Sequence, residues 1–165
     1  MVVTLAVWKS EYIPAVAELA DNPKIAANLR DGFPQPYTLD DAASYVSGCI
    51  AAGDEAQLTR AILADGQVVG SVGVFLREEG AAAELGYWLG EPYWNRGIMS
   101  QAAALLCREA FSHFPVSRIF ATPYAYNTGS RRVLEKSGFR FEGLTVCCGC
   151  SKGEVCMYIQ PRPDT

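Results

Sequence analysis

The sequence contains a single histidine, His113, and no apolar run long enough to cross a membrane. A membrane-spanning helix needs roughly 20 consecutive apolar residues. The best candidate, residues 68–76, is short and is interrupted by Gly70, Ser71 and Gly73. We therefore expect no membrane partner. The histidine follows a helical pattern, and we assign it no role.

Basic residues are also scarce, because 14 lysines and arginines stand against 18 aspartates and glutamates and leave a formal net charge of −4. Nucleic acids and anionic membranes bind proteins through basic faces that displace counterions, so we expect no nucleic-acid partner. Residues 1–8 lack the basic start and the small-residue cleavage site of a secretory leader. These absences predict a cytoplasmic protein.

The chain has 165 residues, half of them hydrophobic, and it shows no internal repeats, low-complexity tracts or linkers. A chain of about 150 residues buries enough surface to form one core, whereas two cores would each lack residues. The sequence therefore predicts a single domain over residues 1–165.

Six cysteines are present, and four of them gather near the C-terminus as Cys147, Cys148, Cys150 and Cys156. In a chain without a secretory leader, reduced thiols are more common than a disulfide framework. Zinc sites combine paired C-x-x-C motifs with further cysteines or histidines, whereas these cysteines are tightly bunched and His113 is remote in the sequence. We expect reduced thiols in a terminal hairpin and no metal. A thiol or metal module built on these cysteines is the alternative.

Hydrophobic periodicity and turn residues predict two helices and an antiparallel meander in the first half of the chain. Thr38 is placed to cap the second helix, and Asp65-Gly66 is typical of a two-residue hairpin turn. The expected elements are a strand over residues 2–8, helices over 13–20 and 39–52 with a loop over 28–37 between them, and strands over 57–63, 68–76 and 83–89.

A helix follows the strand over residues 83–89, so that strand can lie parallel to the next one through a right-handed crossover. Gly138, followed by Phe139, is typical of a glycine that ends a helix. The order of elements, βααβββαβαββ, predicts one α/β domain. The expected elements of this half are a helix over 97–111, a strand over 118–122, a helix over 128–136, and strands over 141–148 and 155–160 that pair across 151–153.

The stretch ELGYWLGEPYWNRGIMSQAA, residues 84–103, turns from a strand into a helix through Arg96 and Gly97. A helix entered in this way presents unpaired amides and the positive end of its dipole, which together hold phosphate groups. Glycine lets the backbone approach the anion, and arginine adds charge. From this turn alone two interpretations stay open: a phosphate site, or a plain strand-to-helix joint with a surface arginine.

Two segments, WNRGIMS over residues 94–100 and NTGSRRVLEKSGF over residues 127–139, together resemble the cofactor-binding motifs of the GNAT superfamily of acyl-CoA-dependent N-acyltransferases. Within it the chain resembles the RimJ/RimL branch of ribosomal-protein N-terminal acetyltransferases, through LRDGFPQPY over residues 29–37 and ELGYWL over residues 84–89. The resemblance covers residues 5–158. It implies an α/β (α+β) fold with a mixed, mostly antiparallel sheet of six to seven strands, flanking helices and one splayed parallel pair.

The resemblance also implies that the chain binds acetyl-CoA as its acetyl donor. Backbone groups near Trp88 and Leu89 would pair with the pantetheine arm, Asn127 would contact the arm beyond the splay, and Arg131 or Arg132 would reach the 3′-phosphate. Asn127 is also a good N-cap for the helix that follows it, so both roles stay open. The residues expected to hold the pyrophosphate are Asn95, Arg96, Gly97, Ile98, Met99 and Ser100.

For catalysis, the resemblance points to Glu84 as the base that takes a proton from the amine, and to the Leu89 N–H as a donor to the oxyanion. Many GNAT enzymes protonate the leaving thiolate with a tyrosine, whereas the matching position here is Leu134. In the RimJ/RimL branch a serine at the place of Ser130 is the suggested substitute. Structural roles for Glu84 and Ser130 are the alternative. The residues expected to form the acceptor site are Arg30, Phe33, Tyr37 and Tyr124.

The expected function is the direct transfer of an acetyl group from acetyl-CoA to a primary amine in a ternary complex. The acceptor is the α-amine of a peptide N-terminus or a small-molecule amine, and the sequence leaves that choice open. A non-catalytic acyl-CoA-binding or sensor module is the alternative. The branch also suggests a homodimer.

Overall fold

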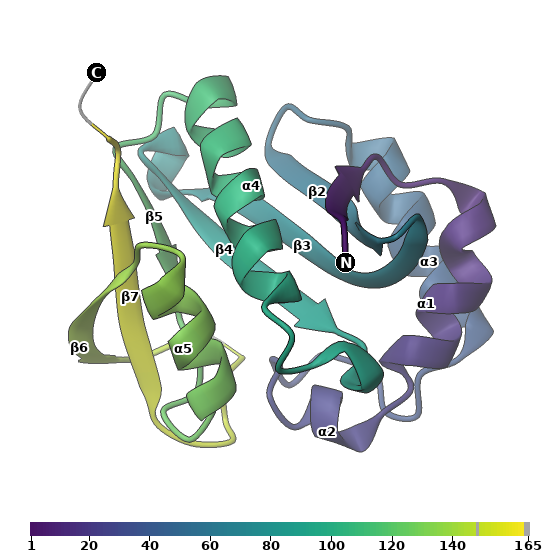
Figure 1. The fold of residues 1–165 in the computed structure, drawn as a ribbon. Helices are drawn as coiled ribbons and strands as arrows, with labels where there is room; N and C mark the ends of the chain where they lie inside the picture. The colour runs from purple at the N-terminus through teal and green to yellow at the C-terminus, as the bar shows by residue number, and fades with distance from the viewer. Residues whose placement is uncertain (148, 164–165) are drawn as a thin grey trace.

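A computed structural model describes residues 1–147 and 149–163, which form a seven-stranded sheet in the order β1-β2-β3-β4-β5-β7-β6 (Figure 1). The β4–β5 pair is parallel, and the other neighbouring pairs are antiparallel. The mixed, mostly antiparallel sheet expected from the sequence is therefore confirmed. The strands are β1 (Val3–Ala6), β2 (Gln57–Ala64), β3 (Gln67–Arg77), β4 (Ala82–Leu89), β5 (Arg118–Ala121), β6 (Arg140–Thr145) and β7 (Val155–Pro161).

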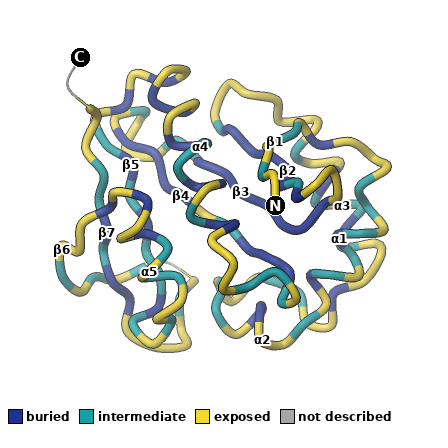
Figure 2. The backbone as a smooth tube through the Cα atoms, viewed as in Figure 1, coloured by how far each residue is buried: buried dark blue, intermediate teal, exposed yellow. Residues whose placement is uncertain are grey.

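Helices cover both faces of the sheet. One buried cluster joins α4 to the sheet on one face, and a second joins α1 and α3 to the other. Figure 1 shows α4 crossing in front of the strands and α5 lying beside β6 and β7, and Figure 2 shows the central strands as the most buried backbone. The α-helices are α1 (Ile13–Ala20), α2 (Pro23–Ala26), α3 (Leu39–Ala52), α4 (Ile98–His113) and α5 (Thr128–Lys136).

Local sequence signals explain where most of these elements begin and end. Thr38 caps α3 in a reciprocal capping box with Asp41, as two short polar side chains at that spacing can. Asp65 and Gly66 both have positive φ angles, which a tight hairpin turn requires. The sequence did not predict the short helix α2, which begins at a proline and is capped by the side chain of Asn22.

The parallel strands β4 and β5 pair over only three positions, from Ala82 with Arg118 to Glu84 with Phe120, and then separate. On the other edge of β4, the Gly90 N–H donates to Val69 O at 2.8 Å. Because backbone groups alternate between the two edges of a strand, those of Leu89 and Tyr87 face the gap toward β5, and those of Trp88 face β3. The backbone groups beside the gap therefore belong to Tyr87 and Leu89, and the Leu89 carbonyl oxygen already accepts from Trp94 Nε1 at 2.7 Å.

The cysteines differ from expectation in one respect. Cys147 and Cys150 form a disulfide, so the prediction of reduced thiols throughout the terminal cluster is wrong for this pair. A tight turn brings them together, because Cys150 N donates to Cys147 O at 3.3 Å and the Cα atoms are 5.4 Å apart, within the range that a disulfide spans. Cys156 is a free, buried thiol. Cys148, also expected in this hairpin, lies outside the described residues.

Residues 1–147 and 149–163 hold no cluster of three or more histidine, cysteine, aspartate or glutamate side chains suited to a metal ion. In the same ranges, no helix combines the length and the apolar character that a membrane span requires.

Candidate active site

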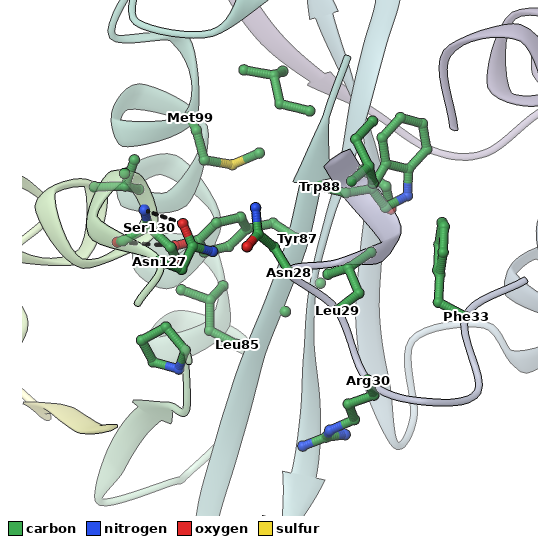
Figure 3. A pocket seen from close by; sticks show the side chains of 18 of the residues that line it. Asn28, Leu29, Arg30, Phe33, Leu85, Tyr87, Trp88, Met99, Asn127 and Ser130 are labelled. Carbon is green, nitrogen blue, oxygen red and sulfur yellow. Dashed lines mark hydrogen bonds between the residues drawn. The ribbon is translucent and has the colours of Figure 1, made fainter. Parts of the chain in front are cut away.

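A cleft of about 1040 Å³ opens where β4 and β5 separate, with the 28–37 loop, the start of α4 and the start of α5 around it (Figure 3). All but two of the site residues expected from the sequence line this cleft. They are Arg30, Phe33, Tyr37, Glu84, Trp88, Leu89, Asn95, Gly97, Ile98, Met99, Ser100, Tyr124, Asn127 and Ser130. The exceptions are Arg96 and Arg131.

The first turn of α4 presents its amides at one end of the cleft. Gly97 precedes the helix in the left-handed conformation, with φ 74°. Because it has no side chain, it cannot cap the amides of the first turn. The first bond of the helix runs from Gln101 N to Gly97 O at 3.2 Å, which leaves the amides of residues 98–100 without an intrahelical acceptor. This turn can therefore hold an anion. The Arg96 side chain lies outside the cleft, in a small hollow beside Met1 and Gln101.

Two arginines at the start of α5 have opposite surroundings. Arg131 donates from Nε to the Tyr158 hydroxyl at 3.0 Å, and its guanidinium lies over the Phe141 ring, 5.2 Å from the centroid. Arg132, one residue further, lines the cleft together with Lys136. A basic contribution to the cleft from this helix therefore comes from Arg132 and Lys136, whereas Arg131 ties α5 to β6 and β7.

Asn127 has the capping position that its sequence context suggested. Its Oδ1 accepts from the Ser130 amide at 3.2 Å, and the same residue lines the cleft, as Figure 3 shows. The cap holds Ser130 in the first turn of α5. The structure is thus compatible with both roles of Asn127, the helix cap and the contact with the cofactor arm.

Tyr87 is a cleft residue that the sequence reasoning missed. Its hydroxyl lies 2.5 Å from the Ser130 hydroxyl, across the gap between β4 and α5 (Figure 3). Burial raises the pKa of the Tyr87 phenol well above its usual value. Leu134, the position that the resemblance matches to a catalytic tyrosine, is fully buried in the core. Strand alternation was the available signal, because it places Tyr87 on the α5 side of β4.

Glu84 faces the opposite side of β4 and is buried, with 9% of its side chain exposed. Oε2 accepts from the guanidinium of Arg30 and, at 3.2 Å, from the Thr122 hydroxyl. Oε1 accepts from Arg77 Nε at 3.1 Å. A buried carboxylate needs such partners, and the contact with Arg30 also fastens the 28–37 loop to β4.

The 28–37 loop forms one wall of the cleft and carries aromatic rings. Phe33 stacks on Tyr37, with centroids 5.1 Å apart, and burial raises the pKa of Tyr37 to about 12. Tyr124, which also lines the cleft, stacks on Tyr126 with centroids 5.1 Å apart. The acceptor residues expected from the sequence therefore all line the cleft, and three of them, Phe33, Tyr37 and Tyr124, contribute aromatic rings to it.

The same wall is tied to the loop between β6 and β7. Asp31 N donates to Gly149 O at 2.8 Å, and the Ser151 hydroxyl donates to Asp31 Oδ1 at 2.8 Å. These bonds lower the pKa of the Asp31 carboxyl, chiefly through the Ser151 side chain. Lys152 Nζ donates to Leu29 O at 2.7 Å. The position of the wall thus depends on the hairpin that contains the disulfide.

The chain is similar in sequence to known proteins. Residues 3–140 match the family described as the Acetyltransferase (GNAT) domain. The uncharacterized N-acetyltransferase YnaD of Bacillus subtilis (strain 168) is 30% identical over 136 residues, which are 81% of this chain and 76% of YnaD. The probable N-acetyltransferase YjcK of the same strain is 39% identical over 82 residues, which are 48% of this chain and 45% of YjcK, so this match spans less than half of that relative's length.

Among solved structures, Mycobacterium smegmatis RimJ in complex with CoA-disulfide has a TM-score of 0.84 and 24% sequence identity, and the match covers 96% of this chain and 81% of RimJ. At this identity the likeness concerns the fold alone.

Proposed function

Because this chain belongs to the GNAT acetyltransferase family, we propose that it transfers the acetyl group of acetyl-CoA directly to a primary amine in a ternary complex. The observation that carries this proposal is the convergence, in one cleft, of free amides at the start of α4, open backbone groups on β4 and the Tyr87–Ser130 hydroxyl pair. The acceptor is a peptide N-terminal α-amine or a small amine.

The cleft has the donors and the shape that an acyl-CoA requires. The amides of residues 98–100 receive the pyrophosphate at the start of α4. Tyr87 offers backbone groups to the amides of the pantetheine arm, where the β4–β5 ladder has ended, and the Leu89 N–H faces the same gap. Arg132 and Lys136 supply positive charge for the remaining phosphate.

The chain's own side chains then divide the proton transfers. Glu84 accepts the proton that the amine loses, directly or through a water, and Arg30 and Arg77 hold its carboxylate in position. The Leu89 N–H stabilises negative charge on the thioester oxygen during transfer. Ser130 donates a proton to the departing sulfur, and Tyr87 replaces the proton on Ser130. Before the next turnover Glu84 releases its proton to solvent and Tyr87 regains one from solvent, so the protons balance.

The amine class determines how much base catalysis is needed. An α-amino group has a pKa of about 7.7–8.0 and is already partly neutral near pH 7, whereas a lysine-like amine has a pKa of about 10.4. A peptide N-terminus is therefore the easier acceptor for a site whose base is a carboxylate. The apolar rings of Phe33 and Tyr124 favour an acceptor that brings apolar groups next to its amine.

Mass spectrometry of reaction products tests this function. The protein is incubated with acetyl-CoA and either a pool of peptides with free N-termini or a pool of polyamines and aminoglycosides. We expect one added acetyl group on members of one pool, absent without enzyme. Acetyl-CoA binding in calorimetry without product in either pool would instead favour a non-catalytic acyl-CoA sensor.

Three expectations from the sequence stay part of this proposal. They are a single acyltransferase domain over residues 1–165, a cytoplasmic location and a homodimer. Size-exclusion chromatography with light scattering tests the last of these.

A further inference from the structure

Glu84 pairs with two arginines that differ in their relation to the cleft. Arg30 donates to Oε2 and lines the cleft, and 47% of its side chain is exposed. Arg77 donates to Oε1, packs over the Phe75 ring and does not line the cleft. Figure 3 shows the Arg30 side chain extending from the 28–37 loop, away from Phe33. Of the two arginines, Arg30 is therefore the one beside the space in which an acceptor lies.

Arg30 has donors to spare. A guanidinium carries five N–H donors in a planar fork, and in the described part of the chain the Arg30 side chain bonds only Glu84, through one terminal nitrogen. A buried carboxylate needs partners, but Arg77 and the Thr122 hydroxyl already bond Glu84. The need to neutralise Glu84 therefore does not account for a second guanidinium that lies in the cleft.

The charges around Glu84 leave an excess of positive charge. Two guanidinium groups pair with this one carboxylate, although the whole chain has a formal net charge of −4. The other carboxylate that lines the described cleft, Asp41, already accepts from the Thr38 amide at 2.8 Å and from the Thr38 hydroxyl at 2.9 Å. Like charges repel at short range. A purely cationic acceptor such as a polyamine is therefore disfavoured here, whereas an acceptor that also carries a carboxylate finds a partner.

We propose that Arg30 is a specificity-determining residue that binds a carboxylate carried by the acceptor close to its amine. With the amine at Glu84, the remaining N–H groups of Arg30 bond the carboxylate, because a guanidinium and a carboxylate match in a two-bond geometry. The adjacent opposite charges of Glu84 and Arg30 are complementary to an amine and a carboxylate on the same or a neighbouring carbon. This inference rests on the proposed function, because it requires the amine to reach Glu84.

Paired acceptors test this assignment. Free amino acids and peptides that begin with an acidic residue share the proposed chemistry, so each source has its own pair. One pair is leucine and leucinamide, and the other is two short lysine-free peptides that begin with aspartate or asparagine. The members of a pair differ only at the carboxylate. The ratio of their kcat/KM values, compared between enzyme variants, therefore measures recognition of the carboxylate, and the pair that responds identifies the source.

Arg30→Gln should lower this ratio by at least about 10-fold in one pair, as expected for the loss of one charge-assisted hydrogen bond. Arg77→Gln is the matched control, because it removes a guanidinium from the same carboxylate outside the cleft. It should keep the wild-type ratio even where kcat falls. Circular dichroism checks folding. If Arg30→Gln does not fold, Arg30→Lys replaces it, and this change should lower the ratio by a smaller factor because it keeps the charge and loses the fork.

The outcomes separate this inference from the proposed function. If the acceptors are acetylated and the Arg30 variants lower kcat/KM equally for both members of each pair, Arg30 has a structural role only, and the inference is refuted while the proposed function stands. An equal fall of the ratio in Arg77→Gln, or product from the polyamine pool with none from the paired acceptors, would refute it in the same way. Absence of product from the paired acceptors and from both pools would overturn both.

Discussion

The phenolic oxygen of Tyr87 lies 2.5 Å from the hydroxyl oxygen of Ser130, so that β4 and α5 meet through two hydroxyl groups inside the cleft. The phenol comes from β4. The position on α5 where many GNAT enzymes have a tyrosine is Leu134 here, and it is fully buried. The distance is that of a strong hydrogen bond between hydroxyls. A proton donor thus stands behind Ser130, at the place where the proposed reaction releases a thiolate.

Tyr87→Phe should lower kcat by about 10²-fold and leave KM for acetyl-CoA nearly unchanged, because the ring remains and only the proton donor is lost. Burial raises the pKa of Tyr87, so the phenol keeps its proton as the pH rises through 10, and the wild-type rate should show no loss from its ionisation below that pH. Steady-state rates from pH 6 to 10 measure both effects. Tyr12→Phe is the matched control, since its ring packs against Trp8. A wild-type rate for Tyr87→Phe at every pH would contradict this role.

Arg132→Ala and Arg131→Ala should have different consequences although the residues are adjacent. Arg132 is exposed and lines the cleft, so its loss should raise KM for acetyl-CoA by about 10-fold, as expected for one charged contact with a phosphate. Arg131 packs on Phe141 and bonds Tyr158, so its loss should lower the urea midpoint of unfolding and leave KM unchanged. Equal KM values for the two variants would contradict this assignment.

The sequence predicted the order of elements because hydrophobic period, glycine turns and helix caps are local signals. Thr38, Asp65-Gly66 and Gly138 each act within a few residues of the boundary that they set. The turn of α4 could likewise be located, because left-handed Gly97 and the free amides after it belong to one continuous segment.

The remaining features depend on contacts between distant segments. Adjacent arginines look alike in a sequence, and only the position of Tyr158, from the last strand, shows that Arg131 is already engaged. The Tyr87–Ser130 contact joins residues 43 positions apart. The disulfide was not predicted because a chain without a secretory leader favours reduced thiols, whereas the turn brings Cys147 and Cys150 together.

Glu84→Gln should reduce kcat for a peptide α-amine by about 10²-fold, because the amide cannot accept the proton that the amine loses. The fold should survive this change, since Arg30 and Arg77 keep 47% and 42% of their side chains exposed and can turn to water. Circular dichroism and KM for acetyl-CoA provide the check on folding. Arg77→Gln removes one of the two arginines that pair with the Glu84 carboxylate, and it should lower kcat by a smaller factor. An unchanged kcat at all pH values would exclude Glu84 as the base.

The link between Asp31 and Ser151 should open in acid. The pKa of Asp31 is lowered from 3.8 by the Ser151 hydroxyl and then by the Ser151 amide. A carboxyl whose pKa is lower in the folded state contributes stability above its ordinary pKa, and this contribution is lost as the pH falls through the folded value. Hydrogen exchange of the Asp31 and Ser151 amides should therefore quicken in acid relative to the core. Asp31→Asn should lack this acid step, and its persistence there would assign the opening to another group.

Gly70→Ala and Gly48→Ala should shift stability in opposite directions. A Cβ on Gly70 would overlap the Trp88 carbonyl oxygen and lie 3.1 Å from the Leu89 Cα, so β4 must move away from β3. We expect a loss of about 1–3 kcal/mol and a higher KM for acetyl-CoA, because the displaced residues border the open gap. Gly48 lies within α3, and a Cβ there meets nothing within 4 Å. Alanine at this position should stabilise the protein by about 0.5–1 kcal/mol through better helix propensity, without altering KM. Urea unfolding and steady-state kinetics compare the two variants. A Gly70→Ala protein with wild-type stability would show that the backbones of β3 and β4 are less tightly apposed than this contact requires.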